Sequence, residues 1–243
     1  MPLWVPVLLA LVAWTVYVGD RLLDARAGLR SGQTGRLRER HYFHWRHRQV
    51  LIPLAVGSGC AAAAIVLLLM PVELRIPNSV FCAVALAYFS GVHADSRLAN
   101  RAPGFLALLF SKESLVGVLF TAACCLPTLS RTANLSAAAS RPIWALAAFF
   151  ATLAWLNCHA IERWESGEAS HIRTIAAGLC LAGLLLAVIF GVRQLRPAAL
   201  FAAGAASALL LALLDRFKDS MASLALRAAA DLALLTPLAL ILR

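Results

Sequence analysis

Two aspartates with the spacing of a shared cation site stand near the N-terminus. Asp20 and Asp24 are four positions apart, with Arg21 between them. In a helix, residues i and i+4 lie on one face about 6 Å apart, so both carboxylates could ligate one Mg²⁺, which takes oxygen ligands and bridges to substrate phosphates. Arg21 is a candidate ligand of such a phosphate. The alternative is an ordinary helix end with solvated charges.

A second acidic group follows about 140 residues later. Glu162 and Glu165 are three positions apart, and Asn157 shares a helical face with Glu165. This pattern predicts a second metal-carboxylate cluster, with the two glutamates as metal ligands and Asn157 as a diphosphate ligand. The alternative is a glutamate-rich helix end followed by a loop.

Charged residues also occur inside or beside apolar stretches. Lys112 stands near the start of one such stretch, and Arg227 and Asp231 form an i,i+4 pair inside another. Charges are costly in hydrocarbon and usually face a polar interior, so Lys112 is a candidate diphosphate ligand. It could instead extend to the membrane interface. For Arg227 and Asp231, ion pairing between helices inside the bundle is the simplest account.

Three histidines precede the second apolar stretch at i, i+3 and i+6. His41, His44 and His47 alternate with aromatic and basic residues, including Arg46 and Arg48. Such a row could bind a metal, since histidine is a common ligand. The pattern is more typical of a juxtamembrane segment that holds lipid headgroups or a substrate phosphate. Arg46 and Arg48 are therefore further candidate diphosphate ligands.

The elements that must position these residues are membrane-spanning helices. Of 243 residues, 61% are hydrophobic and 14% are charged, whereas soluble domains carry roughly 25% charged residues. Apolar runs near 20 residues match a hydrocarbon core about 30 Å thick. The sequence predicts an all-α, polytopic transmembrane bundle forming a single integral domain over 1–243. It has about eight spans, at 2–20, 50–70, 77–93, 105–127, 142–161, 172–191, 197–214 and 221–242.

The net charge of +10 is informative through its distribution. Connections after the odd-numbered spans carry fourteen Lys and Arg, and the opposite side carries six. By the positive-inside rule the richer side is cytoplasmic, which puts both termini outside. In a bacterium this would be the inner or plasma membrane. The basic charge thus reflects orientation, and no nucleic-acid partner is expected. The acidic clusters and all six histidines fall on the cytoplasmic side.

This arrangement resembles the UbiA superfamily of intramembrane prenyltransferases over most of the chain. Asp20 and Asp24 match the last two acids of the family's first motif, Asn-Asp-x-x-Asp-x-x-x-Asp, and Glu162 and Glu165 stand where its second Asp-rich motif would fall. Lys112, followed by a glycine and a proline, is similar to the start of the family's fifth helix. The eight spans would correspond to the family's usual nine without the first.

The sequence also departs from the family pattern. The first Asn-Asp of that motif is absent from this sequence, and the second motif has Asn157 and two glutamates in place of three aspartates. The resemblance implies two Mg²⁺ ions that bind a prenyl diphosphate, followed by ionisation and alkylation of a hydrophobic acceptor. With fewer carboxylates, one metal site is in question, which marks a divergent member with degenerate motifs. The sequence leaves the acceptor and the prenyl length open.

Two other functions remain as alternatives. A non-catalytic lipid-binding or assembly protein of the same fold would explain the missing motif acids. A membrane oxidase or desaturase would use the histidines, although paired His-His boxes are absent from the sequence.

Overall fold

The computed structural model of the protein describes residues 2–30, 39–94, 112–132, 136–167, 171–192 and 194–240. Across these ranges the chain forms α-helices and two short 3₁₀ helices, and none of these residues lies in a β-strand. The all-α class predicted from the sequence is confirmed.

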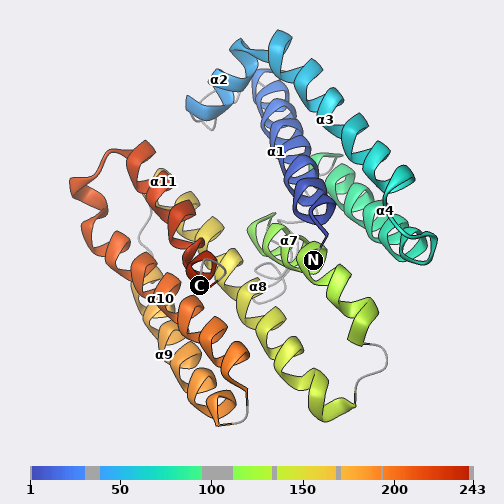
Figure 1. Cartoon of the computed structure of the whole chain (residues 1–243). Coiled ribbons are helices and arrows are strands. Elements are labelled where there is room, and N and C mark those ends of the chain that lie inside the picture. The colour runs from blue at the N-terminus through green and yellow to red at the C-terminus, as the bar shows by residue number, and fades with distance from the viewer. Residues whose placement is uncertain are drawn as a thin grey trace. The chain divides into compact units, whose positions relative to one another are not determined.

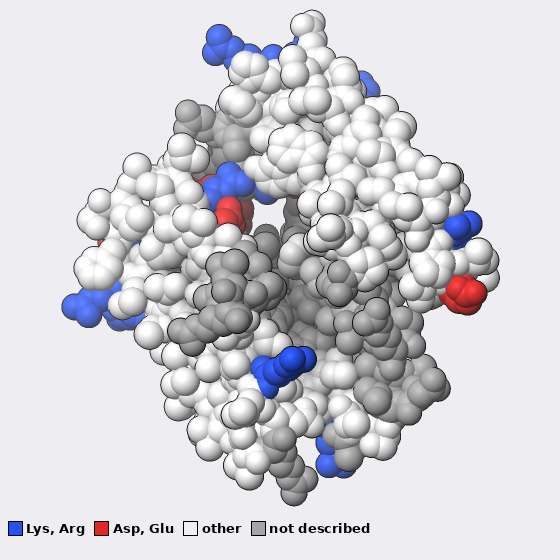
Figure 2. Space-filling view, in the orientation of Figure 1, with Lys and Arg blue, Asp and Glu red and all other residues white. Residues whose placement is uncertain are grey.

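Five helices in the described ranges are long and apolar enough to cross a bilayer: Trp4–Arg30, Arg48–Leu68, Ala139–Ser166, Ile172–Gly191 and Leu195–Ser220. On the face that Figure 2 shows, charged side chains are few and scattered over a mostly uncharged surface. Both observations identify an integral membrane protein. The predicted number of about eight spans is not confirmed, because the five helices do not cover three of the expected spans, 77–93, 105–127 and 221–242.

The last expected span, 221–242, is not one continuous helix. Helix α11 covers Ser223–Ala233 and is followed by the 3₁₀ helix η3 at Thr236–Leu240. Pro237 explains the break, since proline lacks an N–H and its ring clashes with the carbonyl four residues earlier, which here belongs to Ala233. Eleven residues extend about 16 Å, roughly half of the hydrocarbon thickness.

The chain divides into two compact units, Met1–Arg97 and Leu98–Arg243, which are described separately. In the first unit, α1 (Trp4–Arg30) packs against α2 (Glu39–Arg46) and α3 (Arg48–Leu68), and α4 (Val72–Ala94) follows (Figure 1). Ser58 Oγ of α3 donates to Leu11 O of α1 at 3.1 Å. The single integral domain stays a prediction.

The second unit contains the remaining helices. α7 (Lys112–Thr132) packs on α8 (Ala137–Ser166), while α9 (Ile172–Gly191) and α10 (Leu195–Phe217) form an antiparallel pair (Figure 1). The 3₁₀ helix η2 (Lys218–Ser220) leads into α11. α8 is capped at both ends: Ser136 Oγ accepts from Ala139 N, and Gly167, with φ of 69°, donates to Arg163 O.

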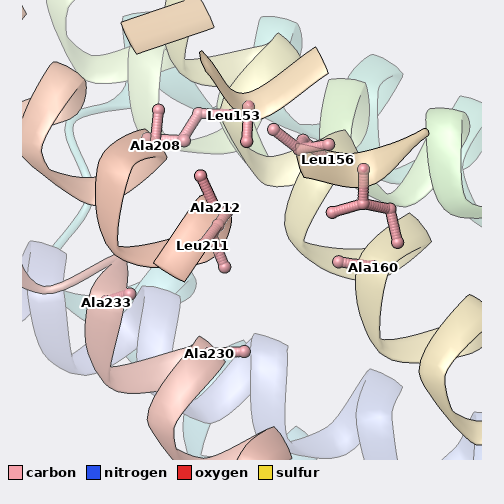
Figure 3. Close-up of a cluster of buried hydrophobic side chains, with 10 residues drawn as sticks. Leu153, Leu156, Ala160, Ala208, Leu211, Ala212, Ala230 and Ala233 are labelled. Carbon is pink, nitrogen blue, oxygen red and sulfur yellow. The ribbon is translucent and has the colours of Figure 1, made fainter. Parts of the chain in front are cut away.

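Small residues let the helices of the second unit approach closely. α8, α10 and α11 bury a cluster in which Leu153, Leu156 and Leu211 pack among alanines (Figure 3). A Cβ added at Gly117 of α7 would lie 2.8 Å from Trp155 N of α8, and glycines of α9 and α10 similarly accommodate Phe149. Such close packing is how helices associate where lipid surrounds them. The core therefore fixes the ends of α8 and α11, which carry the polar residues.

Candidate polar sites

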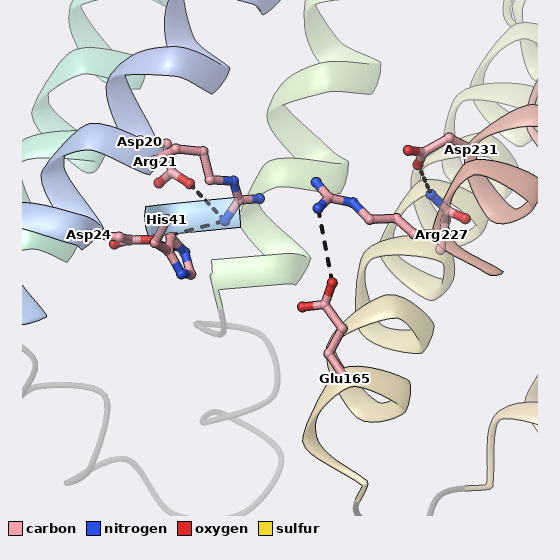
Figure 4. A network of polar contacts seen from close by, with 8 residues as sticks. Asp20, Arg21, Asp24, His41, Glu165, Arg227 and Asp231 are labelled. Atoms are coloured by element: carbon pink, nitrogen blue, oxygen red, sulfur yellow. Dashed lines mark hydrogen bonds and ion pairs between the residues drawn. The ribbon is translucent and has the colours of Figure 1, made fainter. Parts of the chain in front are cut away.

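The first predicted cluster is assembled at the C-terminal part of α1. Arg21 Nη1 lies 3.5 Å from Asp20 Oδ2 and 3.9 Å from Asp24 Oδ2 (Figure 4). His41 of α2 brings Nε2 to 3.7 Å from Asp24 Oδ2. The predicted common face of the two aspartates is therefore observed, with a guanidinium nitrogen close to both carboxylates.

Burial makes this cluster more than a solvated helix end. The side chains of Asp20 and Arg21 are 12% and 17% exposed. Tyr17 covers Arg21, whose guanidinium carbon lies 5.2 Å from the ring centroid, and Tyr17 also contacts the buried His44 edge-on at 5.5 Å. Charges removed from water in this way need opposite charges close by. The cluster is thus a partly desolvated group of both signs.

The row of three histidines separates into two environments. His41 and His44 are buried, whereas His47 is exposed and packs against Phe43 with ring centroids 4.6 Å apart. Three imidazoles therefore do not converge in the described first unit. Helix geometry explains the split, because His47 lies at the junction between α2 and α3, outside both helices.

The two arginines on either side of His47 are exposed. Arg48 Nη1 donates to Trp45 O at 2.9 Å, and its guanidinium lies 4.7 Å from the Trp45 ring centroid. Arg48 thus secures the junction between α2 and α3. Arg46 ends α2. A diphosphate-binding role for either arginine stays a prediction.

The second predicted cluster lies within the second unit and is held by α11. Asn157 Nδ2 donates to Asp231 Oδ1 at 3.2 Å, and Arg227 Nη1 lies 4.0 Å from Glu165 Oε1 (Figure 4). Asn157 is buried, and its Oδ1 has no hydrogen-bond partner in the described part of the chain. Glu162 is half-buried near the same end of α8. The expected ion pairing between helices is observed for Arg227 with Glu165, whereas Asp231 accepts from the neutral amide of Asn157.

One more acidic residue joins this end of the second unit. Asp215, in the last turns of α10, accepts a hydrogen bond from Trp164 Nε1 at 2.8 Å and lies 3.9 Å from Lys218 Nζ. The C-terminal ends of α8 and α10 therefore lie side by side. The sequence signal for this contact was Trp164, next to Glu165 at the end of one apolar stretch, together with Asp215 at the end of a later one.

Lys112 is the first residue of α7, and its side chain lies outside the described residues, as does that of Glu113. Its role as a diphosphate ligand stays a prediction.

The fit to Mg²⁺ is partial. Asp20 and Asp24 direct oxygens toward one cationic nitrogen, Nη1 of Arg21, at 3.5 and 3.9 Å. Among the described residues, no group of three or more His, Cys, Asp or Glu side chains is arranged to hold a metal ion. The two aspartates could hold one ion that a substrate phosphate also ligates.

Comparisons with known protein families, with curated proteins and with solved structures found no match to this chain.

Proposed function

We propose that the protein is a UbiA-like intramembrane prenyltransferase, which transfers a prenyl group from a Mg²⁺-bound isoprenoid diphosphate to an aromatic or lipid-like acceptor. One observation carries the proposal. Arg21, Asp20 and Asp24 form a partly desolvated cluster of both signs at the end of a helix long and apolar enough to span a membrane. A diphosphate with an apolar tail matches such a boundary between charge and hydrocarbon.

The residues of the cluster have distinct roles in this proposal. Bound Mg²⁺ would neutralise the diphosphate and favour its departure. Asp20 and Asp24 would hold that cation through their oxygens, and Arg21 would donate to the phosphate oxygens on which charge develops. The allylic carbon–oxygen bond breaks with its electron pair leaving on diphosphate. The acceptor then forms the new bond to the prenyl carbon and loses a proton.

Glu162 and Glu165 stay predicted metal ligands, and Asn157 and Lys112 stay predicted diphosphate ligands. The cytoplasmic placement of the acidic clusters belongs to the same proposal, because the donor would be supplied from that side.

The test is Mg²⁺-dependent binding and turnover of farnesyl and geranylgeranyl diphosphate by detergent-purified protein. Losing one charged ligand costs about 1.5–3 kcal/mol, so Asp24→Asn should weaken binding at least about tenfold. Asp20→Asn and Glu165→Gln test the other predicted ligands. Asp219→Asn, at an exposed aspartate on η2, is the matched control and should bind as the unaltered protein does. Equal affinity in Asp24→Asn and Asp219→Asn would exclude the proposed role of Asp24.

A second candidate is a non-catalytic lipid-binding or assembly protein of the same fold. It is favoured by the basic or amide groups that already lie against the acids: Arg21 beside Asp20 and Asp24, and Arg227 beside Glu165. It predicts that no inorganic diphosphate is released from farnesyl diphosphate, whether or not this compound binds and whatever acceptor is supplied. Release that depends on Mg²⁺ and on Asp24 would rule this candidate out.

A further inference from the structure

Helix α2 of the first unit has two sides of different character. On the inner side, His41 and His44 are buried and contact side chains of α1. On the outer side, Phe43 is 56% exposed, and Arg46 is exposed three positions later. Residues three apart follow one side of a helix, so the two pairs lie on opposite sides. The helix is therefore held on its unit by one side and exposes an aromatic and a basic side chain on the other.

The position of α2 in the chain places this outer side at the edge of a bilayer. α2 ends at Arg46, and Arg48 begins α3, which has the length and apolar composition of a membrane span. Residues 49–72 contain no Asp, Glu, Lys or Arg. Both arginines therefore lie within about one helical turn, roughly 5 Å, of the start of the apolar segment. At that depth a bilayer presents its polar headgroups.

The outer side has the chemistry of a binding surface for lipid phosphates. A guanidinium carries five N–H donors, and Arg48 uses one of them on Trp45 O while the side chain stays exposed. Guanidinium groups bind phosphate oxygens through paired hydrogen bonds. Phe43, which packs against His47, adds an exposed ring of the kind that enters the boundary between headgroups and acyl chains. Two cations so placed favour a headgroup with net negative charge.

We propose that the outer side of α2 binds the headgroups of anionic phospholipids, with Arg46 and Arg48 at the phosphates and Phe43 beside the glycerol backbone. The buried His41 and His44 then hold the helix on α1 and do not bind the lipid. The inference needs neither Mg²⁺ nor a prenyl diphosphate, so it stands or fails separately from the proposed function.

The test is native mass spectrometry of delipidated, detergent-purified protein titrated with phosphatidylglycerol and phosphatidylcholine of the same acyl chains, without Mg²⁺. We expect phosphatidylglycerol to bind at least about tenfold more tightly. Arg46→Gln should weaken its binding about fivefold, as expected for one arginine near an anionic surface. Arg46→Gln combined with Arg48→Gln should reduce its affinity to about that of phosphatidylcholine.

Three further variants separate a lipid site from general basic charge or a structural role. Arg26→Gln combined with Arg30→Gln removes two exposed arginines from the end of α1 in the same unit and should keep the preference. Arg46→Lys combined with Arg48→Lys keeps the charge and should keep most of it. Phe43→Ser removes apolar contact alone and should weaken both lipids alike. Arg46→Gln by itself leaves the contact of Arg48 with Trp45 intact, so it serves if the double variant fails to fold.

Equal affinity for the two lipids would overturn the inference, and so would a preference that survives Arg46→Gln combined with Arg48→Gln. An equal loss in the double variant of α1 would also overturn it, because the attraction would then come from diffuse basic charge. Displacement of phosphatidylglycerol by inorganic diphosphate at an equal concentration would identify a diphosphate site and overturn it as well.

Discussion

At the residue scale, Arg21 is the cation that makes the first cluster possible. Its Nη1 lies within 4 Å of both Asp20 and Asp24, and all three side chains are less than one-third exposed. Two carboxylates so placed would repel one another without a cation between them. The i,i+4 spacing predicted their common face, since helical periodicity is local. The contact with His41 could not be predicted, because it depends on how α2 returns along α1.

The first prediction at this scale concerns stability. Arg21→Ala should destabilise the protein by about 1–3 kcal/mol, because it leaves two partly buried carboxylates without their cation. Arg26→Ala removes an exposed arginine five positions later on the same helix and is the matched control. Thermal unfolding in detergent at neutral pH measures both. A midpoint for Arg21→Ala equal to that of Arg26→Ala would contradict the role given to Arg21.

The second cluster shows a different limit of sequence reasoning. Asn157 and Glu165 were identified from one helix, but their partners Asp231 and Arg227 come from α11, more than sixty residues later. The charges inside the last apolar stretch did indicate that this segment faces other helices. Which charge meets which could not be predicted, because it depends on the antiparallel packing of α11 against α8.

At the element scale, glycines set the distance between neighbouring helices. Gly117 of α7 faces the backbone of α8 near Trp155, where an added Cβ would lie 2.8 Å from a backbone nitrogen. A rigid backbone cannot move aside as the end of a side chain can. Long apolar helices could be predicted from composition and periodicity, and five are found with spanning length. The end of α11 at Ala233 could have been predicted from Pro237, which was instead included in a continuous span.

The prediction at the element scale is that Gly117→Ala separates α7 from α8. Overpacking of this kind costs about 1–3 kcal/mol, which exceeds the helix-propensity gain of about 1 kcal/mol. Gly178→Ala on α9 is the control, because nothing lies within 4 Å of the added Cβ. This variant should show only the stabilisation from the higher helix propensity of alanine. Thermal unfolding in detergent should therefore shift in opposite directions for the two variants. A stabilised Gly117→Ala would show that the close approach is absent.

At the scale of the whole molecule, charge distribution predicts orientation in the membrane. Eight arginines between residues 21 and 48 dominate the excess of basic residues on the predicted cytoplasmic side. The structure gives helices and their packing within each unit, whereas sidedness depends on the insertion of the chain into a particular bilayer.

The prediction is that Arg26→Cys reacts with a membrane-impermeant thiol reagent only when the cytoplasmic face is accessible. The background would have its six native cysteines replaced by alanine. Glu73→Cys, at an exposed position in the first turn of α4, should react only from the opposite face. Labelling of Glu73→Cys from the cytoplasmic face and of Arg26→Cys from outside would reverse the predicted topology.

The shortness of α11 has a consequence for biosynthesis. An eleven-residue helix that carries Arg227 and Asp231 has too little apolar length to enter the bilayer alone. Its polar partners come from α8, which supplies Glu165 and Asn157. In η3, the Thr236 hydroxyl donates to the Ala203 carbonyl of α10 and contacts the Ser207 hydroxyl. We therefore expect α11 and η3 to enter the membrane only after α8 and α10 are in place, so insertion of this segment depends on the folding of the helices before it.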